Sequence, residues 1–444
     1  MTQMITTLCP TAIGILRANV TPGALHNSLE RSDPPKCHRH TRKAVRGEIM
    51  TWVKKQGVVR RLLWLYGPAG SGKTSIAQSI AERCKKNGLL AADFFMSGPV
   101  PGRNDTIHLI ATLAYQLTLS IPELRRHIAS AVDRDPLIFH SSLEAQLDAL
   151  VVQPFFQSGL DASTIKPRLI IIDGLDECRD PKSQGNIVSV ISSAVQQPLF
   201  PFLFLIASRP QQVIRKAFNH NTTSMLTHRL VLDDTYKPDA DIKAFLVARF
   251  RKIKNQHPSG RSLPSPWPKD DAIDFLVKKS SGQFIYASTI IKYIESPSTS
   301  PGHRLGVILG LEPRGDNTPF AELDAFYSHI FSSINNLDLV VKIFSFLIFK
   351  QDELYTRYST MELLENFLGL RPGELNATLA DLHSILDIPS PDDSSAFIRI
   401  LHASLPDFLL DKGRSGTYYI DSESAHCFLF KCCIRMLSET GMHT

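Results

Sequence analysis

Gly67-Pro-Ala-Gly-Ser-Gly-Lys73-Thr74 matches the pattern G-x-x-x-x-G-K-[ST] of a phosphate-binding loop. The loop follows the apolar run Leu62-Leu-Trp-Leu-Tyr66, which has the profile of a buried parallel strand. After the loop, apolar residues recur at helical spacing at Ile76, Ala77, Ile80 and Ala81. A strand, a glycine-rich turn and a helix form the context in which this pattern binds phosphate. An ordinary glycine turn is the alternative.

The residue types in the loop suit a nucleoside triphosphate with Mg²⁺. Glycines let successive backbone N–H groups turn inward around phosphate oxygens, and the helix that follows adds its positive N-terminal end. Lys73 would bridge the β- and γ-phosphates, and the Thr74 hydroxyl would ligate Mg²⁺. We therefore expect ATP or GTP to be held by Gly67, Pro68, Ala69, Gly70, Ser71, Gly72, Lys73, Thr74 and Ser75.

An acidic cluster follows a second apolar run, Leu169-Ile-Ile-Ile-Asp173-Gly-Leu-Asp176-Glu177. An aspartate at the carboxyl end of such a strand orders the Mg²⁺ shell in P-loop enzymes, and we assign this role to Asp173. Asp176 or Glu177 would orient or polarise the attacking water. The alternative is an acidic turn that caps the next helix.

A third apolar run, at residues 202–207, ends in Ser208-Arg209-Pro210. If this strand neighbours the strand that ends at Asp173, Arg209 could reach a γ-phosphate and report whether the triphosphate is intact. The alternative is a surface salt bridge.

The order of elements predicts an α/β fold. Strand-like runs at 62–66, 90–95, 169–172 and 202–207 are separated by helical stretches such as 107–119 and 143–156, which indicates a parallel sheet covered on both faces. Helices are expected beyond Arg209, at 239–252, 272–280, 284–294, 337–349, 360–368 and 374–386, with a strand at 396–401. We expect four parts: a disordered lead-in (1–35), the NTPase core (36–230), a small helical domain (231–303) and a winged-helix-like and helical region (304–444).

The composition places limits on location and partners. A net charge of +6, from 49 basic and 43 acidic residues, does not argue for nucleic acid. The seven cysteines are odd in number and lack paired spacing, so a reducing, cytoplasmic setting is expected. No apolar run is long enough to predict a membrane span or signal peptide.

In combination, the phosphate loop, Asp173-Gly-Leu-Asp-Glu177 and Ala207-Ser-Arg-Pro210 resemble the NACHT class of signal-transduction (STAND) NTPases, in the fungal group related to the nephrocystin-like N-terminal domain. Gly282-Gln-Phe-Ile-Tyr-Ala-Ser-Thr289 and His402-Ala-Ser-Leu-Pro-Asp-Phe-Leu409 are similar to segments that follow the core in that group.

The resemblance implies a three-layer NTPase core, a helical domain and a winged-helix domain that switch between closed diphosphate and open triphosphate states. By position, His402 resembles the winged-helix histidine that contacts the β-phosphate of bound diphosphate; a packed histidine is the alternative. Phe284 stands where relatives often carry a proline near the base, which leaves the choice between adenine and guanine open.

The ends of the chain depart from the class, whose members usually carry an N-terminal effector domain and C-terminal sensor repeats. We therefore expect one of three situations: the sensor lies on another chain, the gene product is truncated, or the protein works as a bare switch.

Two functions share this pocket. The first is a regulatory NTPase with slow hydrolysis, whose nucleotide state sets domain arrangement and self-association into a homo-oligomer, with protein partners that the sequence does not identify. The second is a nucleotide-bound scaffold without meaningful turnover. The acidic cluster favours the first. A metabolic kinase would need an acceptor pocket and a lid, and the sequence indicates neither.

Overall fold

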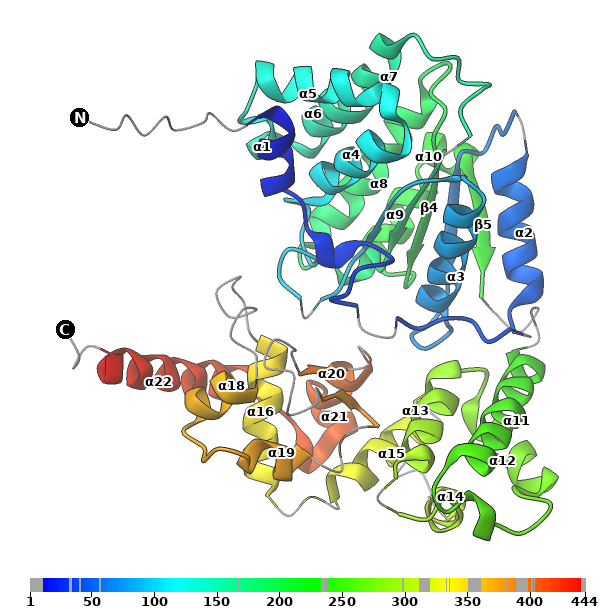
Figure 1. Ribbon diagram of the computed structural model, residues 1–444, viewed down its shortest axis with the longest axis vertical. Helices are drawn as coiled ribbons and strands as arrows, with labels where there is room; N and C mark the ends of the chain where they lie inside the picture. Colours follow the sequence, from blue (N-terminus) through cyan, green and yellow to red (C-terminus); the bar gives the residue numbers. More distant parts are fainter. Residues whose placement is uncertain are drawn as a thin grey trace, which may run out of the picture. The chain divides into compact units, whose positions relative to one another are not determined.

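The computed structural model (Figure 1) describes residues 11–31, 34–39, 41–55, 57–98, 100–166, 168–232, 236, 238–297, 299–310, 320–332, 334, 336–349, 361–379, 382, 384–388, 398–400, 402 and 404–440. Its contacts divide the chain into two compact units. The first contains residues 1–37, 42–68 and 73–236, and the second contains residues 38–41, 69–72 and 237–444.

A five-stranded parallel sheet forms the centre of the first unit. Its order is β2-β3-β4-β1-β5, with β1 at Leu62–Tyr66, β2 at Leu90–Phe95, β3 at Leu169–Asp173, β4 at Leu203–Ser208 and β5 at Thr227–Val231. The first four strands were predicted from their apolar runs. The edge strand β5 was not predicted, because Thr-His-Arg-Leu-Val mixes polar and apolar residues. It pairs with β1 along one edge only.

Helices cover both faces of this sheet, because successive strand residues point to opposite sides. On one face, α2 (Lys43–Lys54) and α3 (Lys73–Lys86) bury residues such as Ile49, Ile76 and Ile80 against Leu63 and Ile171. Figure 1 shows α2 and α3 on this side. On the other face lie α4 (Leu109–Ser120), α5 (Arg125–Arg134), α8 (Pro181–Gln196) and α9 (Gln212–Asn219). The α/β class and the layer of helices on each face are as predicted.

Helix bounds in this unit follow the predictions closely. The helix expected at 107–119 is α4. The stretch expected to be helical at 143–156 is divided into α6 (Leu143–Leu147), a π-helical turn (Asp148–Val152) and α7 (Gln153–Ser158). A further short helix, α10 (Asn221–Leu226), precedes β5.

The interpretation of residues 1–35 as a disordered lead-in is wrong for residues 11–31. This segment contains α1 (Ala12–Ala18) and a 3₁₀ turn (Pro22–Ala24), with Leu16 and Ala24 fully buried in the core of the first unit. Thr11 caps α1 by accepting from the Gly14 amide. A helix of only 7 residues shows too little periodicity to be predicted from the sequence.

The second unit is built mainly of helices around its own core of Ile, Leu and Phe side chains. Its helices are α11 (Pro238–Gln256), α12 (Asp270–Ser280), α13 (Phe284–Glu295), α14 (Pro301–Leu309), α15 (Ala321–Ser332), α16 (Leu337–Phe349), α18 (Met361–Leu368), α19 (Glu374–Leu379), α20 (Ser404–Leu409), α21 (Lys412–Ser415) and α22 (Ser422–Thr440). Strands β6 (Leu386–Asp387) and β7 (Arg399–Ile400) pair antiparallel.

Two predictions in this unit need correction. The helix expected at 374–386 ends at Leu379, and Leu386 lies instead in β6. The strand expected at 396–401 is represented by β7, while residues 396, 397 and 401 lie outside the described residues. The winged-helix assignment stays a prediction.

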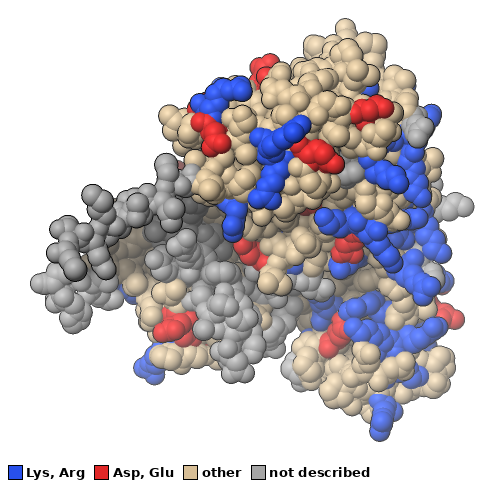
Figure 2. Space-filling view, turned by 45° about the horizontal axis from the view of Figure 1, so that its top comes forward, with Lys and Arg blue, Asp and Glu red and all other residues tan. Residues whose placement is uncertain are grey.

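None of the helices among the described residues is long and apolar enough to span a bilayer. On the face shown in Figure 2, Lys and Arg side chains gather toward one side and Asp and Glu side chains lie among them. The basic surplus on this face is therefore interrupted by acidic groups.

Candidate functional site

The sheet order brings the predicted site residues of the first unit to one edge. Strand β4 lies between β1 and β3, with Ser208 paired to Tyr66 and Ala207 paired to Asp173. The carboxyl ends of parallel strands meet at the same edge, where ligands bind in open α/β sheets. The turn after β1, the acidic end of β3 and Arg209 after β4 are therefore neighbours.

Residues 67–72 connect β1 to α3, which begins at Lys73. Gly70 and Gly72 have φ of +73° and +91°, a conformation that glycine adopts without strain. The Lys73 ammonium folds back on the loop and donates to the carbonyls of Gly67 at 2.9 Å and Pro68 at 2.8 Å. Burial lowers the pKa of Lys73 to about 8, against the opposing effect of the nearby carboxylates. At pH 7 the ammonium is therefore still mostly charged.

Thr74 and Asp173 form the next contact. The Thr74 side chain hydrogen-bonds to the Asp173 carboxyl, which is only 2% exposed. Burial raises the pKa of Asp173 to about 6, and the Thr74 hydrogen bond and the charges of Arg31 and Lys73 oppose this shift. Among the described residues, Asp173 Oδ1 is buried and has no hydrogen-bond partner.

A buried carboxylate oxygen without a partner is costly, and it fits an ion or its water shell. In the described part of the chain no group of three or more His, Cys, Asp or Glu could hold a metal by itself. The oxygens of Thr74 and Asp173 are of the type that Mg²⁺ prefers, and beside nucleotides this ion usually keeps waters and phosphate oxygens as its other ligands.

Asp176 and Glu177 follow in a 3₁₀ turn, Leu175–Glu177, that starts from Gly174 at φ +76°. Asp176 contacts Arg209: its Oδ1 accepts from the Arg209 amide at 2.9 Å, and its Oδ2 lies 3.2 Å from Arg209 Nε. Both carboxylate oxygens of Asp176 are thus engaged by one residue of the neighbouring strand end. The salt bridge that was an alternative for Arg209 is present, and it lies within the cluster.

Glu177 has a different environment from Asp176. Its Oε2 accepts from the Gly98 amide at 2.9 Å. Burial raises the pKa of Glu177 to about 7, with a further contribution from the negative charge of Asp176. A carboxyl group that changes charge near neutral pH is suited to accept a proton from water.

The other predicted residues are placed as follows. Ser75 lies in the first turn of α3, where its carbonyl accepts from the Ser79 hydroxyl. His402 belongs to the second unit and lies just before α20, where its Nδ1 accepts from the Ser404 amide at 3.0 Å. Its contact with a nucleotide stays a prediction.

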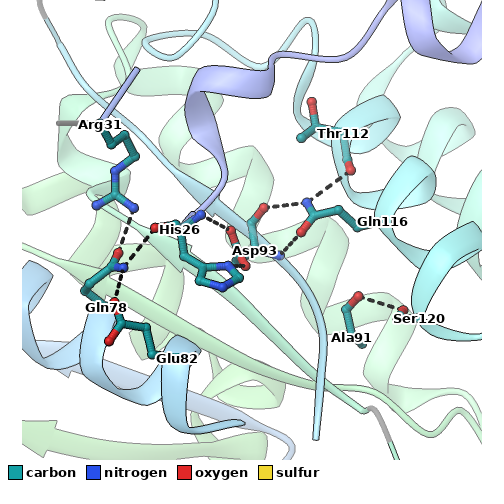
Figure 3. A network of polar contacts seen from close by, with 9 residues as sticks. All are labelled: His26, Arg31, Gln78, Glu82, Ala91, Asp93, Thr112, Gln116 and Ser120. Atoms are coloured by element: carbon teal, nitrogen blue, oxygen red, sulfur yellow. Dashed lines mark hydrogen bonds and ion pairs between the residues drawn. The ribbon is translucent and has the colours of Figure 1, made fainter. Parts of the chain in front are cut away.

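Sequence reasoning missed a polar network that joins the N-terminal segment to α3 and β2 (Figure 3). His26 and Arg31, from the N-terminal segment, contact Asp93 of β2 and Gln78 of α3. One signal could have found it: Asp93 stands inside the apolar run Leu-Ala-Ala-Asp-Phe-Phe, and a buried aspartate requires a partner. Nothing in the sequence points to Arg31.

A parallel sheet, a glycine-rich loop between β1 and α3, and a Thr74–Asp173 contact at the end of β3 define a P-loop NTPase-like domain. Residues 45–209, from α2 to the end of β4, match the family described as "Nephrocystin 3, N-terminal". The match covers the phosphate loop, Asp173 and Arg209. None of the curated proteins compared with the chain matches it.

Three solved structures show a loose likeness to the chain. A structure of Drosophila ORC bound to DNA is 13% identical, covers 86% of this chain and 97% of its own, and has a TM-score of 0.37. The Cdc6p structure from Pyrobaculum aerophilum is 12% identical, with coverages of 93% and 100% and a TM-score of 0.37. A point mutant of Thermotoga maritima RuvB is 14% identical, with coverages of 82% and 94% and a TM-score of 0.32. Likeness at this level does not indicate function.

Proposed function

We propose that this protein binds ATP or GTP with Mg²⁺, hydrolyses it slowly, and uses the nucleotide state as a conformational switch. The observation that carries the proposal is the Thr74–Asp173 contact beside Lys73. It joins the hydroxyl of the phosphate loop to a buried carboxylate that has an unpartnered oxygen among the described residues. A structural turn would have no need of this arrangement.

The residues divide the work by position. Lys73 would leave the carbonyls of Gly67 and Pro68 to contact the β- and γ-phosphates. Thr74 and Asp173 would hold Mg²⁺ and its waters, and the bound ion would neutralise charge that develops on the phosphates. Arg209, held by Asp176, would face the γ-phosphate from the end of β4.

Glu177 is the better candidate for orienting and deprotonating the attacking water. Both oxygens of Asp176 contact Arg209, while burial brings the pKa of Glu177 to about 7. A base works best with a pKa near the working pH. Asp176 then acts through Arg209 as a positioning residue.

The finer assignment is to a NACHT-type switch of the fungal nephrocystin-like group. The match of residues 45–209 to the "Nephrocystin 3, N-terminal" family supports it. The helices of the second unit and the β6–β7 ribbon are compatible with a helical and a winged-helix domain. In this account His402 contacts bound diphosphate, and triphosphate binding favours self-association of the chain.

The proposal is tested by identifying any nucleotide that remains bound to the protein after purification. The protein is denatured and the released small molecules are identified by mass. We expect ATP, GTP or their diphosphates in amounts that approach one per chain, and diphosphate would indicate a closed resting switch. Protein that carries no nucleotide and also takes up none when it is added would overturn the proposal.

A further inference from the structure

The segment 19–31 of the first unit, which we call the N-terminal strap, contacts β2, α3 and α4. Its Thr21 amide donates to the Thr112 hydroxyl of α4 at 3.0 Å, and its Thr21 hydroxyl donates to the Gly102 carbonyl. His26 contacts the fully buried Asp93 of β2 through both its amide and Nδ1, at 2.7 and 2.5 Å. The strap is thus joined to β2 by buried polar contacts and to α4 by a partly buried one.

Arg31, near the end of the strap, lies between α3 and β2. Its Nη1 donates to Gln78 Oε1 at 2.7 Å, and its guanidinium carbon is 3.8 Å from the centre of the Phe95 ring. Gln78 also donates to the His26 carbonyl, so it connects both strap residues to α3 (Figure 3). Arg31 is only 8% exposed. A planar cation that donates on one side and stacks on an aromatic ring is well fixed in place.

Both contacts of Arg31 lead to the proposed Mg²⁺ residues. Gln78 is four residues after Thr74 on α3, so the two side chains lie on the same helix face one turn apart. Phe95 is the residue that pairs with Asp173 across β2 and β3, and paired residues of parallel strands point to the same face. Arg31 therefore contacts a neighbour of each member of the Thr74–Asp173 pair: Gln78 beside Thr74 and Phe95 beside Asp173.

The charges around Arg31 are consistent with its position near Asp173. Burial lowers the pKa of Arg31, and among the carboxylates that oppose this shift Asp173 acts most strongly, ahead of Asp93 and Glu82. A buried cation needs a nearby negative charge, and Asp173 supplies it.

We propose that Arg31 is a positioning residue of the nucleotide site, which holds Thr74 and Asp173 in the geometry that Mg²⁺ requires. This role rests on the proposed function. It also makes the N-terminal strap part of the nucleotide site, because Arg31 comes from a segment that precedes the phosphate loop by more than thirty residues.

The test compares Arg31→Met with Arg31→Lys in the full chain. Methionine keeps much of the side-chain volume but removes the donor and the charge, while lysine can still donate to Gln78 and lie over Phe95. We expect Arg31→Met to raise the Mg²⁺ concentration needed for half-maximal triphosphate binding by at least about threefold, the value of one modest hydrogen bond. Affinity in EDTA should change less, since Lys73 and the loop amides hold the phosphates. Arg31→Lys should lie between wild type and Arg31→Met, because lysine keeps the charge and a donor but loses the planar group that stacks on Phe95.

Arg17→Gln is the matched control, because Arg17 is an exposed arginine of α1 near the strap. Thermal unfolding of each variant reports any loss of stability, and Arg31→Gln replaces the methionine variant if that one does not fold. Folded Arg31→Met with a wild-type Mg²⁺ requirement would overturn the role, whatever its melting temperature. Wild-type protein that binds no nucleotide would overturn the proposed function itself, and this role with it.

Discussion

Arg209 and Asp176 contact each other twice, through the Arg209 amide to Oδ1 at 2.9 Å and through Arg209 Nε to Oδ2 at 3.2 Å. The two residues come from the ends of neighbouring strands, β4 and β3. This contact distinguishes the two acidic residues of the turn by their partners: Asp176 contacts Arg209, while Oε2 of Glu177 accepts from the Gly98 amide at 2.9 Å.

Replacing Lys73 by Ala should weaken triphosphate binding by about tenfold or more, because hydrogen bonds from a charged donor to phosphate are worth about 1.5–3 kcal/mol. A labelled triphosphate, titrated into folded protein, gives the affinity. Lys85→Ala is the matched control, since Lys85 is an exposed lysine at the opposite end of the same helix. Equal affinities for the Lys73 variant and wild type would contradict the assignment of residues 67–74 as the phosphate-binding loop.

Substitutions of the three acidic residues should affect hydrolysis and nucleotide binding differently. Glu177→Gln should slow hydrolysis by about a hundredfold or more with little change in binding, since a general base acts on water in the transition state. Asp176→Asn should slow hydrolysis less, through a loosened Arg209. Asp173→Asn should mainly weaken the Mg²⁺-dependent part of binding. Single-turnover hydrolysis with saturating nucleotide measures the rates, and nucleotide titration with and without Mg²⁺ measures the binding. Wild-type rates in all three variants would favour the scaffold function.

The raised pKa of Glu177 should make the free energy of unfolding depend on pH. Burial raises its pKa from 4.5 to about 7, so the folded state binds more protons than the unfolded state between these values. The contribution of Glu177 to wild-type stability therefore falls as pH rises from about 4.5 to about 7, and Glu177→Gln removes this fall. Urea unfolding should show that the variant gains on wild type across this range and keeps the gain above pH 7.

Glu144→Gln, on the exposed surface of α6, is the control for this pH series. A difference between Glu177→Gln and wild type that does not vary with pH would mean that Glu177 is solvated like an ordinary surface glutamate.

His402→Ala should shift the chain toward an open, self-associating form and speed diphosphate release. A hydrogen bond from His402 to phosphate would be donated by Nε2, because Nδ1 accepts the Ser404 amide. Such a bond is worth ~1.5–3 kcal/mol, which changes a closed-to-open ratio by roughly ten- to a hundredfold. Light scattering after size exclusion and a diphosphate off-rate decide the matter. Identical mass and off-rate would make His402 a packed residue of the second unit.

The residues that sequence reasoning located share one property: the signal is local. The phosphate loop carries its own pattern, and strands β1 to β4 are buried on both faces and so appear as apolar runs. Asp173 was placed correctly at the end of β3 for the same reason.

What the sequence did not reveal depends on tertiary contacts. Strand β5 is defined by its pairing with β1, since Thr-His-Arg-Leu-Val carries little apolar signal. The Asp176–Arg209 contact joins residues 33 positions apart, and the Arg31–Gln78 contact joins residues 47 apart. No local pattern marks such a partner, because the fold alone decides which side chains meet.

Binding of nucleotide is the central claim, and isothermal titration of nucleotide-free wild-type protein with ATP and with GTP, each with Mg²⁺, tests it most directly. We expect saturable binding of at least one of the two nucleotides at one site per chain. This binding should be weaker in EDTA, because Thr74 and Asp173 act through the metal. Folded protein that binds neither nucleotide would contradict the account.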